Sequence, residues 1–130
     1  MIHQTQLILY VSEQDKSKEF YKKILQLDSI LDVPGMTEFD LGTNTKLGLM
    51  PETGIAKILQ SKVPHPIFGN GIPRCEIYLS VDKVQPYINR SIDNGAKLVS
   101  PLKNRDWRDR VAYFADPDGH IIAFAEKKDS

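Results

Sequence analysis

The sequence predicts an α+β fold in which a strand–helix–three-strand unit, βαβββ, occurs twice. Three observations support this: alternating apolar residues indicate short strands, two segments show the apolar spacing of a helix, and the same order of elements returns after about 70 positions. We expect pseudo-twofold symmetry between the two units, with a helix covering one face of each sheet. The opposite faces must then meet each other, a partner chain or a ligand, and we expect the sheets to form a cup-shaped cleft.

The first unit is predicted to begin with a strand over residues 4–11, where the side chains alternate between two faces. Ser12 is the expected N-cap of the helix that follows, and Asp15 occupies the position of an acidic capping box. The apolar side of this helix shows helical spacing at Phe20, Ile24 and Leu27. Three short strands, separated by turns, are expected at residues 29–33, 37–41 and 46–50.

A segment rich in proline and glycine separates the two units. Residues 51–73 contain four prolines and three glycines, which break any long element, so we expect a linker or a covering loop here. Only residues 55–59 favour a short helical turn. The predicted organisation is a single domain over residues 1–130, with one module at about 1–50, this linker, and a second module at about 74–130.

The second unit repeats the pattern of the first. A strand over residues 75–81 alternates, and this alternation predicts that Cys75 is buried on the helix-facing side. Asp82 is the expected N-cap of the next helix, with Gln85 at the capping-box position, and an Asn-Gly pair ends that helix. Strands are expected at residues 97–100, 110–115 and 120–126. A DPDG sequence between the last two predicts a type I turn.

The two units align residue by residue. A shift of about 70 positions pairs Gln6 with Glu76, Leu9 with Leu79, and Val11 with Val81. A shift of about 75 positions pairs Leu47 with Ile122, and Leu49 with Phe124. The first and last strands of each unit therefore correspond.

Composition excludes several classes of function. Lysine and arginine total 17, as do aspartate and glutamate, so the formal net charge is zero, which argues against a general nucleic-acid binder. No apolar stretch is long enough to span a bilayer, and the first residues lack the basic leader and apolar run of a secretion signal. The single cysteine permits no intrachain disulfide. We therefore expect a cytoplasmic protein with neither a nucleic-acid nor a membrane partner.

Four segments together resemble one known superfamily: LILYVSEQDKSKEFYKKILQL, EIYLSVDKVQPYI, NGAKLV and RVAYFADPDGHIIAFAE. In this order and spacing they are similar to the glyoxalase, bleomycin-resistance and extradiol-dioxygenase proteins, also called the vicinal oxygen chelate superfamily. The resemblance covers nearly the whole chain. It implies a fold of paired βαβββ modules, which agrees with the pattern found above.

The resemblance also implies positions for a divalent metal, which the enzymes of this superfamily hold in the cup between the modules. The first-strand ligand positions fall on Gln6 and Glu76, whose side chains carry oxygen donors. The last-strand positions fall on Gly48 and Ala123, which have no side-chain donor. Because catalytic and structural zinc sites generally use at least three protein ligands, we expect no complete metal site and no cofactor.

The ligand-binding face is expected to carry six side chains: Gln6, Ile8, Tyr10, Glu76, Tyr78 and Trp107. Amide, carboxylate and aromatic groups together suit a polar, partly planar small molecule. Trp107 lies in the polar loop KNRDWRDR, where a large aromatic ring seals a pocket, forms a subunit contact or anchors the loop. The arginines of this loop alternate with aspartates, which predicts surface ion pairs within the loop. A solvated Glu76, or one paired with Arg74, is the alternative to a ligand contact.

The predicted function is a small-molecule-binding protein of the glyoxalase and bleomycin-resistance type that lacks a complete catalytic metal site. The resemblance implies a homodimer, and planar ligands with cationic parts. Two alternatives stay open. One is a glyoxalase-like lyase or isomerase in which Gln6 and Glu76 hold one divalent metal ion. The other is a structural or regulatory module whose cup is filled by its own side chains, such as Ile8, Ile121 and Phe68.

Overall fold

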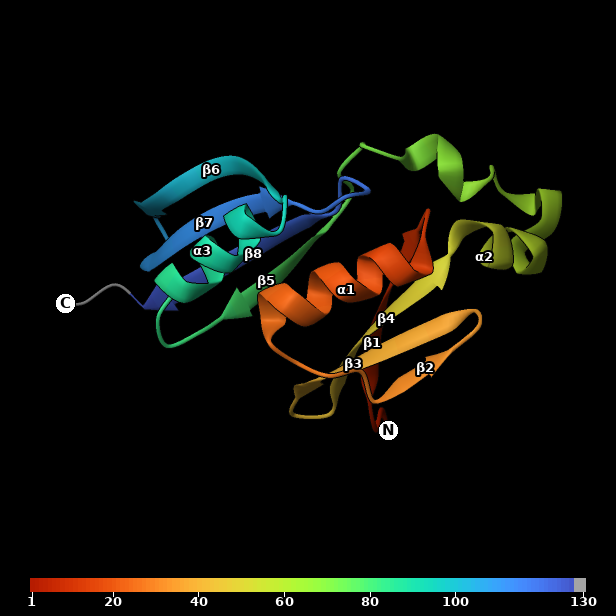
Figure 1. Ribbon diagram of the computed structural model, residues 1–130, viewed down its shortest axis with the longest axis horizontal. Helices are drawn as coiled ribbons and strands as arrows, with labels where there is room; N and C mark the ends of the chain where they lie inside the picture. The colour runs from red at the N-terminus through yellow and green to blue at the C-terminus, as the bar shows by residue number, and fades with distance from the viewer. Residues whose placement is uncertain (128–130) are drawn as a thin grey trace. The chain divides into compact units, whose positions relative to one another are not determined.

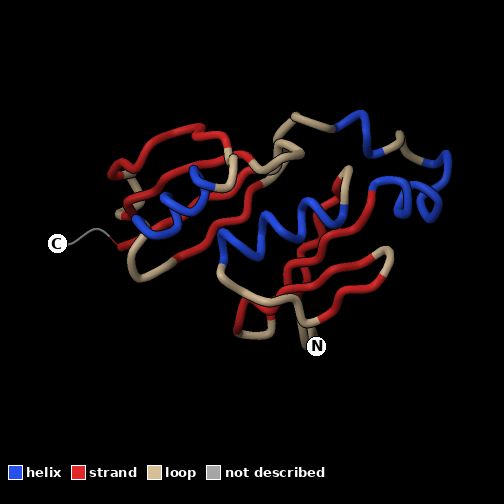
Figure 2. Tube along the Cα trace, viewed as in Figure 1, coloured by secondary structure: helices blue, strands red, loops and turns tan. Residues whose placement is uncertain are grey.

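The computed structural model describes residues 1–127, which divide into two compact units, one over Met1–Asn70 and one beginning at Gly71. Each unit contains one four-stranded sheet with a helix between its first and second strands (Figures 1 and 2). This confirms the predicted α+β class and the two βαβββ modules. No helix among the described residues is both long enough and apolar enough to cross a membrane.

The first unit has the sheet order β1-β4-β3-β2, in which β1 and β4 run parallel and the other pairs antiparallel. Its elements are β1 (Thr5–Val11), α1 (Gln14–Leu25), β2 (Leu31–Val33), β3 (Met36–Gly42) and β4 (Thr45–Pro51). Along the chain, α2 (Glu52–Leu59) follows β4, and after it come two short 3-10 helices, η1 (Gln60–Lys62) and η2 (Pro66–Gly69). The segment predicted to be a linker is thus largely helical in its first half.

The core of the first unit lies between α1 and one face of the sheet. The buried apolar residues of the strands alternate, so that they all lie on this face: Leu9, Val11, Phe39, Leu47 and Leu49. The residues of α1 that pack there have helical spacing: Phe20, Tyr21, Ile24 and Leu25. The alternate positions of β1 and β4 therefore lie on the face opposite α1.

The second unit has the equivalent sheet order β5-β8-β7-β6, again with one parallel pair, β5 with β8. Its elements are β5 (Glu76–Ser80), α3 (Gln85–Asp93), β6 (Lys97–Asn104), β7 (Asp109–Ala115) and β8 (Ile121–Lys127). Phe124 lies at the centre of its core, with ring centroids 5.1 Å from Tyr87 of α3 and 6.3 Å from Phe114 of β7. The other side of this sheet, opposite α3, carries the alternate residues.

The pairing of the parallel strands confirms the internal repeat. Ile8 of β1 lies opposite Gly48 of β4, and Tyr78 of β5 lies opposite Ala123 of β8. The sequence shift of 70 positions relates Ile8 to Tyr78, and the shift of 75 relates Gly48 to Ala123, so equivalent residues pair in the two units. The DPDG turn is also confirmed, because the Gly119 N–H donates to the Asp116 carbonyl at 3.0 Å.

Both predicted N-caps are wrong. Helix α1 begins at Gln14, with Glu13 rather than Ser12 at the N-cap. Helix α3 begins at Gln85, with Val84 rather than Asp82 at the N-cap. The Val84 N–H donates instead to the carboxylate Oε2 of Glu126 on β8, at 2.9 Å. A side chain distant in the sequence therefore satisfies the donor that a local cap was expected to satisfy.

Cys75 is exposed, contrary to the prediction that it is buried. The alternation rule applies only to residues within a paired strand, and β5 begins one residue later, at Glu76. Ile77, the next residue on the α3 side, is buried as predicted.

Candidate functional site

The face of the second sheet opposite α3 brings together two of the predicted site residues, Glu76 and Tyr78 of β5. Strand pairing places Tyr78 beside Ala123 of β8, and Ala123 beside Tyr113 of β7. Two tyrosines thus flank an alanine in one row across the sheet. Trp107 joins them, because its indole Nε1 donates a hydrogen bond to the Tyr78 hydroxyl at 2.8 Å. We call Glu76, Tyr78, Trp107 and Tyr113 the aromatic face.

Small residues form the floor of the aromatic face. Val111, Ala123 and Ala125 are fully or almost fully buried in one apolar cluster, and Tyr113 packs against it. Ala123 lies in the row of the two tyrosines and Ala125 in the next row, between Ser80 and Val111. The resemblance placed a metal ligand at the position of Ala123, but this side chain carries no donor and is not accessible.

A chain of two hydrogen bonds orients the exposed aromatic rings. Trp107 donates to Tyr78, and the Tyr78 hydroxyl donates to Oδ2 of Asp109 at 2.5 Å. Trp107 nevertheless remains 54% exposed and Tyr78 37% exposed. Polar atoms of both rings are therefore bound within the protein, while much of their apolar surface is accessible. Sequence reasoning missed Asp109, although its place at the start of a predicted strand was a usable signal.

Arg105 holds the loop that carries Trp107. Its Nη2 donates to the Ser100 hydroxyl and to two carbonyls, those of Pro101 and Val111, at 2.9–3.1 Å. Its guanidinium carbon also lies 5.1 Å from the centroid of the Tyr113 ring, a cation–π distance. The predicted ion pairs within the loop are therefore wrong for Arg105. Carbonyl groups and an aromatic ring, rather than aspartates, bind this cation.

Burial and nearby charges raise the pKa values of both tyrosines of the aromatic face. Burial raises the pKa of Tyr113, and the negative charge of Glu76 raises it further, while Arg105 opposes this. Burial also raises the pKa of Tyr78, as does its hydrogen bond to Asp109, while the bond from Trp107 lowers it. Both hydroxyls are protonated at neutral pH.

These shifts predict a loss of stability in alkaline solution. A tyrosine whose pKa is raised on folding favours the folded state fully below its unfolded pKa of 10.0, and this contribution is lost as the pH rises through the folded pKa. We expect the free energy of unfolding, from urea titrations at about pH 9 and pH 11, to fall less steeply with pH in Y78F/Y113F than in the natural protein. Equal slopes would contradict the prediction.

Glu76 is exposed and has no hydrogen-bond or ion-pair partner within residues 1–127. The predicted alternative of a pair with Arg74 is therefore not realised. This carboxylate lies two residues from Tyr78 along β5, so it presents a negative charge on the sheet face that also carries the exposed Tyr78 ring. This arrangement can bind a positively charged or hydrogen-bond-donating group of a ligand.

The first unit holds the other three predicted site residues on the face of its sheet opposite α1. Gln6, Ile8 and Tyr10 alternate along β1, and Ile8 is 36% exposed. The amide Nε2 of Gln6 donates to Oε2 of Glu38 at 2.8 Å, and Lys46 lies 3.5 Å from the other carboxylate oxygen. Sequence reasoning missed Glu38: alternation within the predicted strand 37–41 gives its face, but its place beside Gly48 depends on the pairing of β3 with β4.

Gly48 is closely surrounded by side chains. A Cβ atom at this position would lie 2.7 Å from the amide nitrogen of Gln6, 3.1 Å from Ile8 and 3.3 Å from Met36, so a larger residue here would require the Gln6 side chain to move. Two of the four positions at which the resemblance implies metal ligands thus hold no donor. Within residues 1–127, no group of three or more histidine, cysteine, aspartate or glutamate side chains is placed to hold a metal ion. The described residues do not fit the metal centre of the enzymes.

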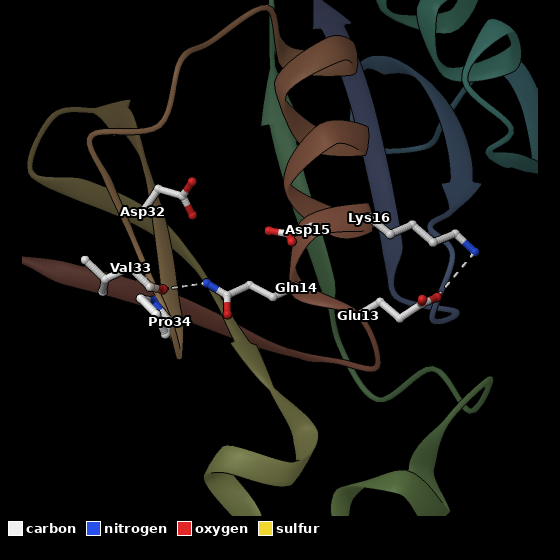
Figure 3. Close-up of a pocket in the computed structure, with 7 residues that line it drawn as sticks. All are labelled: Glu13, Gln14, Asp15, Lys16, Asp32, Val33 and Pro34. Atoms are coloured by element: carbon white, nitrogen blue, oxygen red, sulfur yellow. Dashed lines mark hydrogen bonds and ion pairs between the residues drawn. The ribbon is translucent and has the colours of Figure 1, made fainter.

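A separate hollow of about 580 Å³ lies at the beginning of α1 (Figure 3). It is lined by Glu13, Gln14, Asp15, Lys16, Asp32, Val33 and Pro34. The Gln14 amide spans it, donating to the Val33 carbonyl at 2.8 Å and to the Thr37 hydroxyl at 2.9 Å. None of the predicted site residues lines this hollow, and the contacts of Gln14 fix the hairpin of β2 and β3 to α1.

Residues 4–128 match the family of glyoxalase-like domains. The fold is similar to a glyoxalase-related enzyme from Fulvimarina pelagi, with a TM-score of 0.81 and 19% identity over 95% of this chain and 86% of that one. A glyoxalase/bleomycin resistance protein/dioxygenase from Nocardioides gives a TM-score of 0.75 with 22% identity, covering 97% and 83%. TnmS3, an antibiotic binding protein from Streptomyces sp. CB03234, gives 0.71 with 26% identity, covering 98% of both chains.

Proposed function

The chain belongs to the family of glyoxalase-like domains, and we propose that it binds a planar, positively charged small molecule without a catalytic metal. The observation that carries this proposal is the aromatic face of the second unit. There, Trp107 and Tyr78 are hydrogen-bonded to each other and expose much of their ring surface, and Tyr78 shares its sheet face with Glu76, a carboxylate without a partner among the described residues. Flat rings can stack on the aromatic side chains, and a cationic group can meet the carboxylate.

Affinity at such a face comes from apolar burial on rings that are already oriented. The hydrogen bonds to Trp107 and Tyr78 fix both rings before a ligand arrives, which lowers the entropy lost on binding. No covalent step is required. The similarity to TnmS3, an antibiotic binding protein, supports a small-molecule ligand.

A metal-dependent lyase or isomerase is a weaker proposal for this chain. Such chemistry needs a metal that polarises a carbonyl next to the carbon that loses its proton. Gly48 and Ala123 have no donor atom in their side chains, which leaves Gln6 and Glu76 as the two remaining positions. Glu76 alone would lack the electrophile that makes proton abstraction practicable.

A self-filled module is the other alternative, and the burial of Ala123 and Ala125 favours it in part. The exposure of Ile8 and Trp107, and the strong exposure of Phe68, oppose it, because these large apolar side chains would then be expected to be packed.

The proposed homodimer is tested by sedimentation equilibrium of the natural protein.

The test of the proposed function is calorimetric titration with proflavine, a flat tricyclic cation, and with anthracene carboxylate, a flat anion of similar size. We expect saturable binding of proflavine and much weaker binding of the anion. E76Q should lower the proflavine affinity roughly fivefold, the loss of an exposed charge contact of about 1 kcal/mol. E19Q, which removes an exposed carboxylate from α1, is the matched control and should leave the affinity unchanged. Equal affinity in E76Q and the natural protein, or tighter binding of the anion, would contradict the proposal.

A further inference from the structure

Asp109, Tyr78 and Trp107 form a hydrogen-bonded relay whose direction is fixed by chemistry. An indole N–H can only donate, so the Tyr78 oxygen must accept the bond from Trp107. An ionised carboxylate can only accept, so the Tyr78 hydroxyl proton must point to Asp109. Both hydrogen bonds can therefore form in one direction only: Trp107 donates to Tyr78, and Tyr78 donates to Asp109.

We infer that Asp109 is a positioning residue for the aromatic face: by accepting the Tyr78 hydroxyl proton, it directs a lone pair of Tyr78 at the Trp107 indole and holds that ring in place. The importance of this relay for ligand binding rests on the proposed function. Its importance for the orientation of Trp107 rests on the hydrogen bonds alone.

The backbone of the loop explains why Trp107 needs this support. The loop is closed at its base by the Arg105 N–H, which donates to the Asp109 carbonyl at 2.8 Å, and Arg108 adopts a left-handed conformation with φ of 72°. These features fix the main chain. The indole itself is more than half exposed, so packing restrains it weakly, and its bond to Tyr78 sets the direction of the ring.

The relay also affects which ligands the face can accept. Because the polar hydrogens of Trp107 and Tyr78 are both bound within the protein, a ligand meets the surfaces of these rings but not their donors. A ligand that depends on accepting hydrogen bonds from them gains nothing. Glu76 remains available as an acceptor, so the relay favours ligands that carry donors or positive charge.

Fluorescence tests the relay directly, because Trp107 is the single tryptophan of the chain. We expect D109A and Y78F each to shift the emission to longer wavelength and to increase quenching by acrylamide, since the freed indole becomes more accessible. D106A is the matched control: it removes an exposed carboxylate from the same loop, and Asp106 has no hydrogen-bond or ion-pair partner among residues 1–127. If D109A leaves emission and quenching as unchanged as D106A does, the inference is wrong.

Two further variants separate positioning from a general structural effect. The double variant Y78F/D109A should resemble either single variant, because both substitutions interrupt one relay; additive changes would contradict this. D109N keeps a carbonyl oxygen that can accept the Tyr78 proton, so it should restore emission and quenching close to those of the natural protein. A D109N variant as strongly quenched as D109A would overturn the proposed hydrogen-bond role.

A failure of the proposed function can be distinguished from a failure of the inference about Asp109. The fluorescence measurements need no ligand, so they hold even if proflavine does not bind the natural protein. Where proflavine binds, D109A should weaken its affinity roughly tenfold, the effect of losing a hydrogen bond to a charged group. A changed emission with an unchanged proflavine affinity would show that the positioning of Trp107 does not serve binding, and would contradict that part of the inference.

Discussion

Replacing Phe124 by alanine is expected to lower the free energy of unfolding by about 3–5 kcal/mol. Phe124 is fully buried, and its ring contacts Tyr87 of α3 and Phe114 of β7. Its removal therefore leaves a cavity between the helix and the sheet of the second unit, where the surrounding rings can collapse only in part. Urea titration followed by circular dichroism measures the loss.

The matched control for this prediction is I92A. Ile92 also lies in the second unit but is 53% exposed on α3, so its truncation should change the free energy of unfolding by no more than about 0.5 kcal/mol. Similar losses in F124A and I92A would mean that Phe124 is not central to the core of this unit.

Replacing Trp107 by alanine is expected to weaken proflavine binding roughly 30-fold, corresponding to about 2 kcal/mol for an aromatic residue at the centre of a binding face. The indole is the more exposed of the two hydrogen-bonded rings, at 54% against 37% for Tyr78. Its exposure also means that W107A should keep nearly the natural melting temperature. Calorimetric titration gives the affinity, and thermal unfolding monitors the fold.

W107F separates stacking from hydrogen bonding at this position. Phenylalanine keeps a flat ring but cannot donate to Tyr78, so we expect an affinity between those of W107A and the natural protein. An affinity in W107A equal to that of the natural protein would remove Trp107 from the ligand site.

Local patterns allowed most of the fold to be predicted. Alternation identified β1 and β5, and helical spacing identified α1 and α3, because these signals lie within short stretches of chain. The repeat identified which residues of the two parallel pairs are equivalent. The errors have a different origin. Val84 donates to Glu126, 42 residues away, and no local pattern records a contact of that separation. Helix starts were therefore misplaced by one or two residues.

The candidate site was predictable only by residue type. The sequence predicted Tyr78 as an aromatic residue in a strand and Trp107 as a lone tryptophan in a polar loop, but not the contact between them. Their contact spans 29 residues, and that of Tyr78 with Asp109 spans 31. Such pairs depend on how β5, β7 and β8 align in the sheet. Glu38 was missed for a similar reason, since its bond to Gln6 joins residues 32 positions apart.

Thermal unfolding of the metal-stripped protein with nickel, zinc, manganese and ferrous iron tests the central claim most directly. A ligand of the folded state raises its stability with the logarithm of free concentration over Kd, about 2.7 kcal/mol at 100 times Kd. Because Gly48 and Ala123 supply no donor, we predict no saturable rise in Tm with any of these ions, and a clear rise with proflavine. A saturable rise with a divalent ion that disappears in E76A would contradict the account and favour the metal-dependent enzyme.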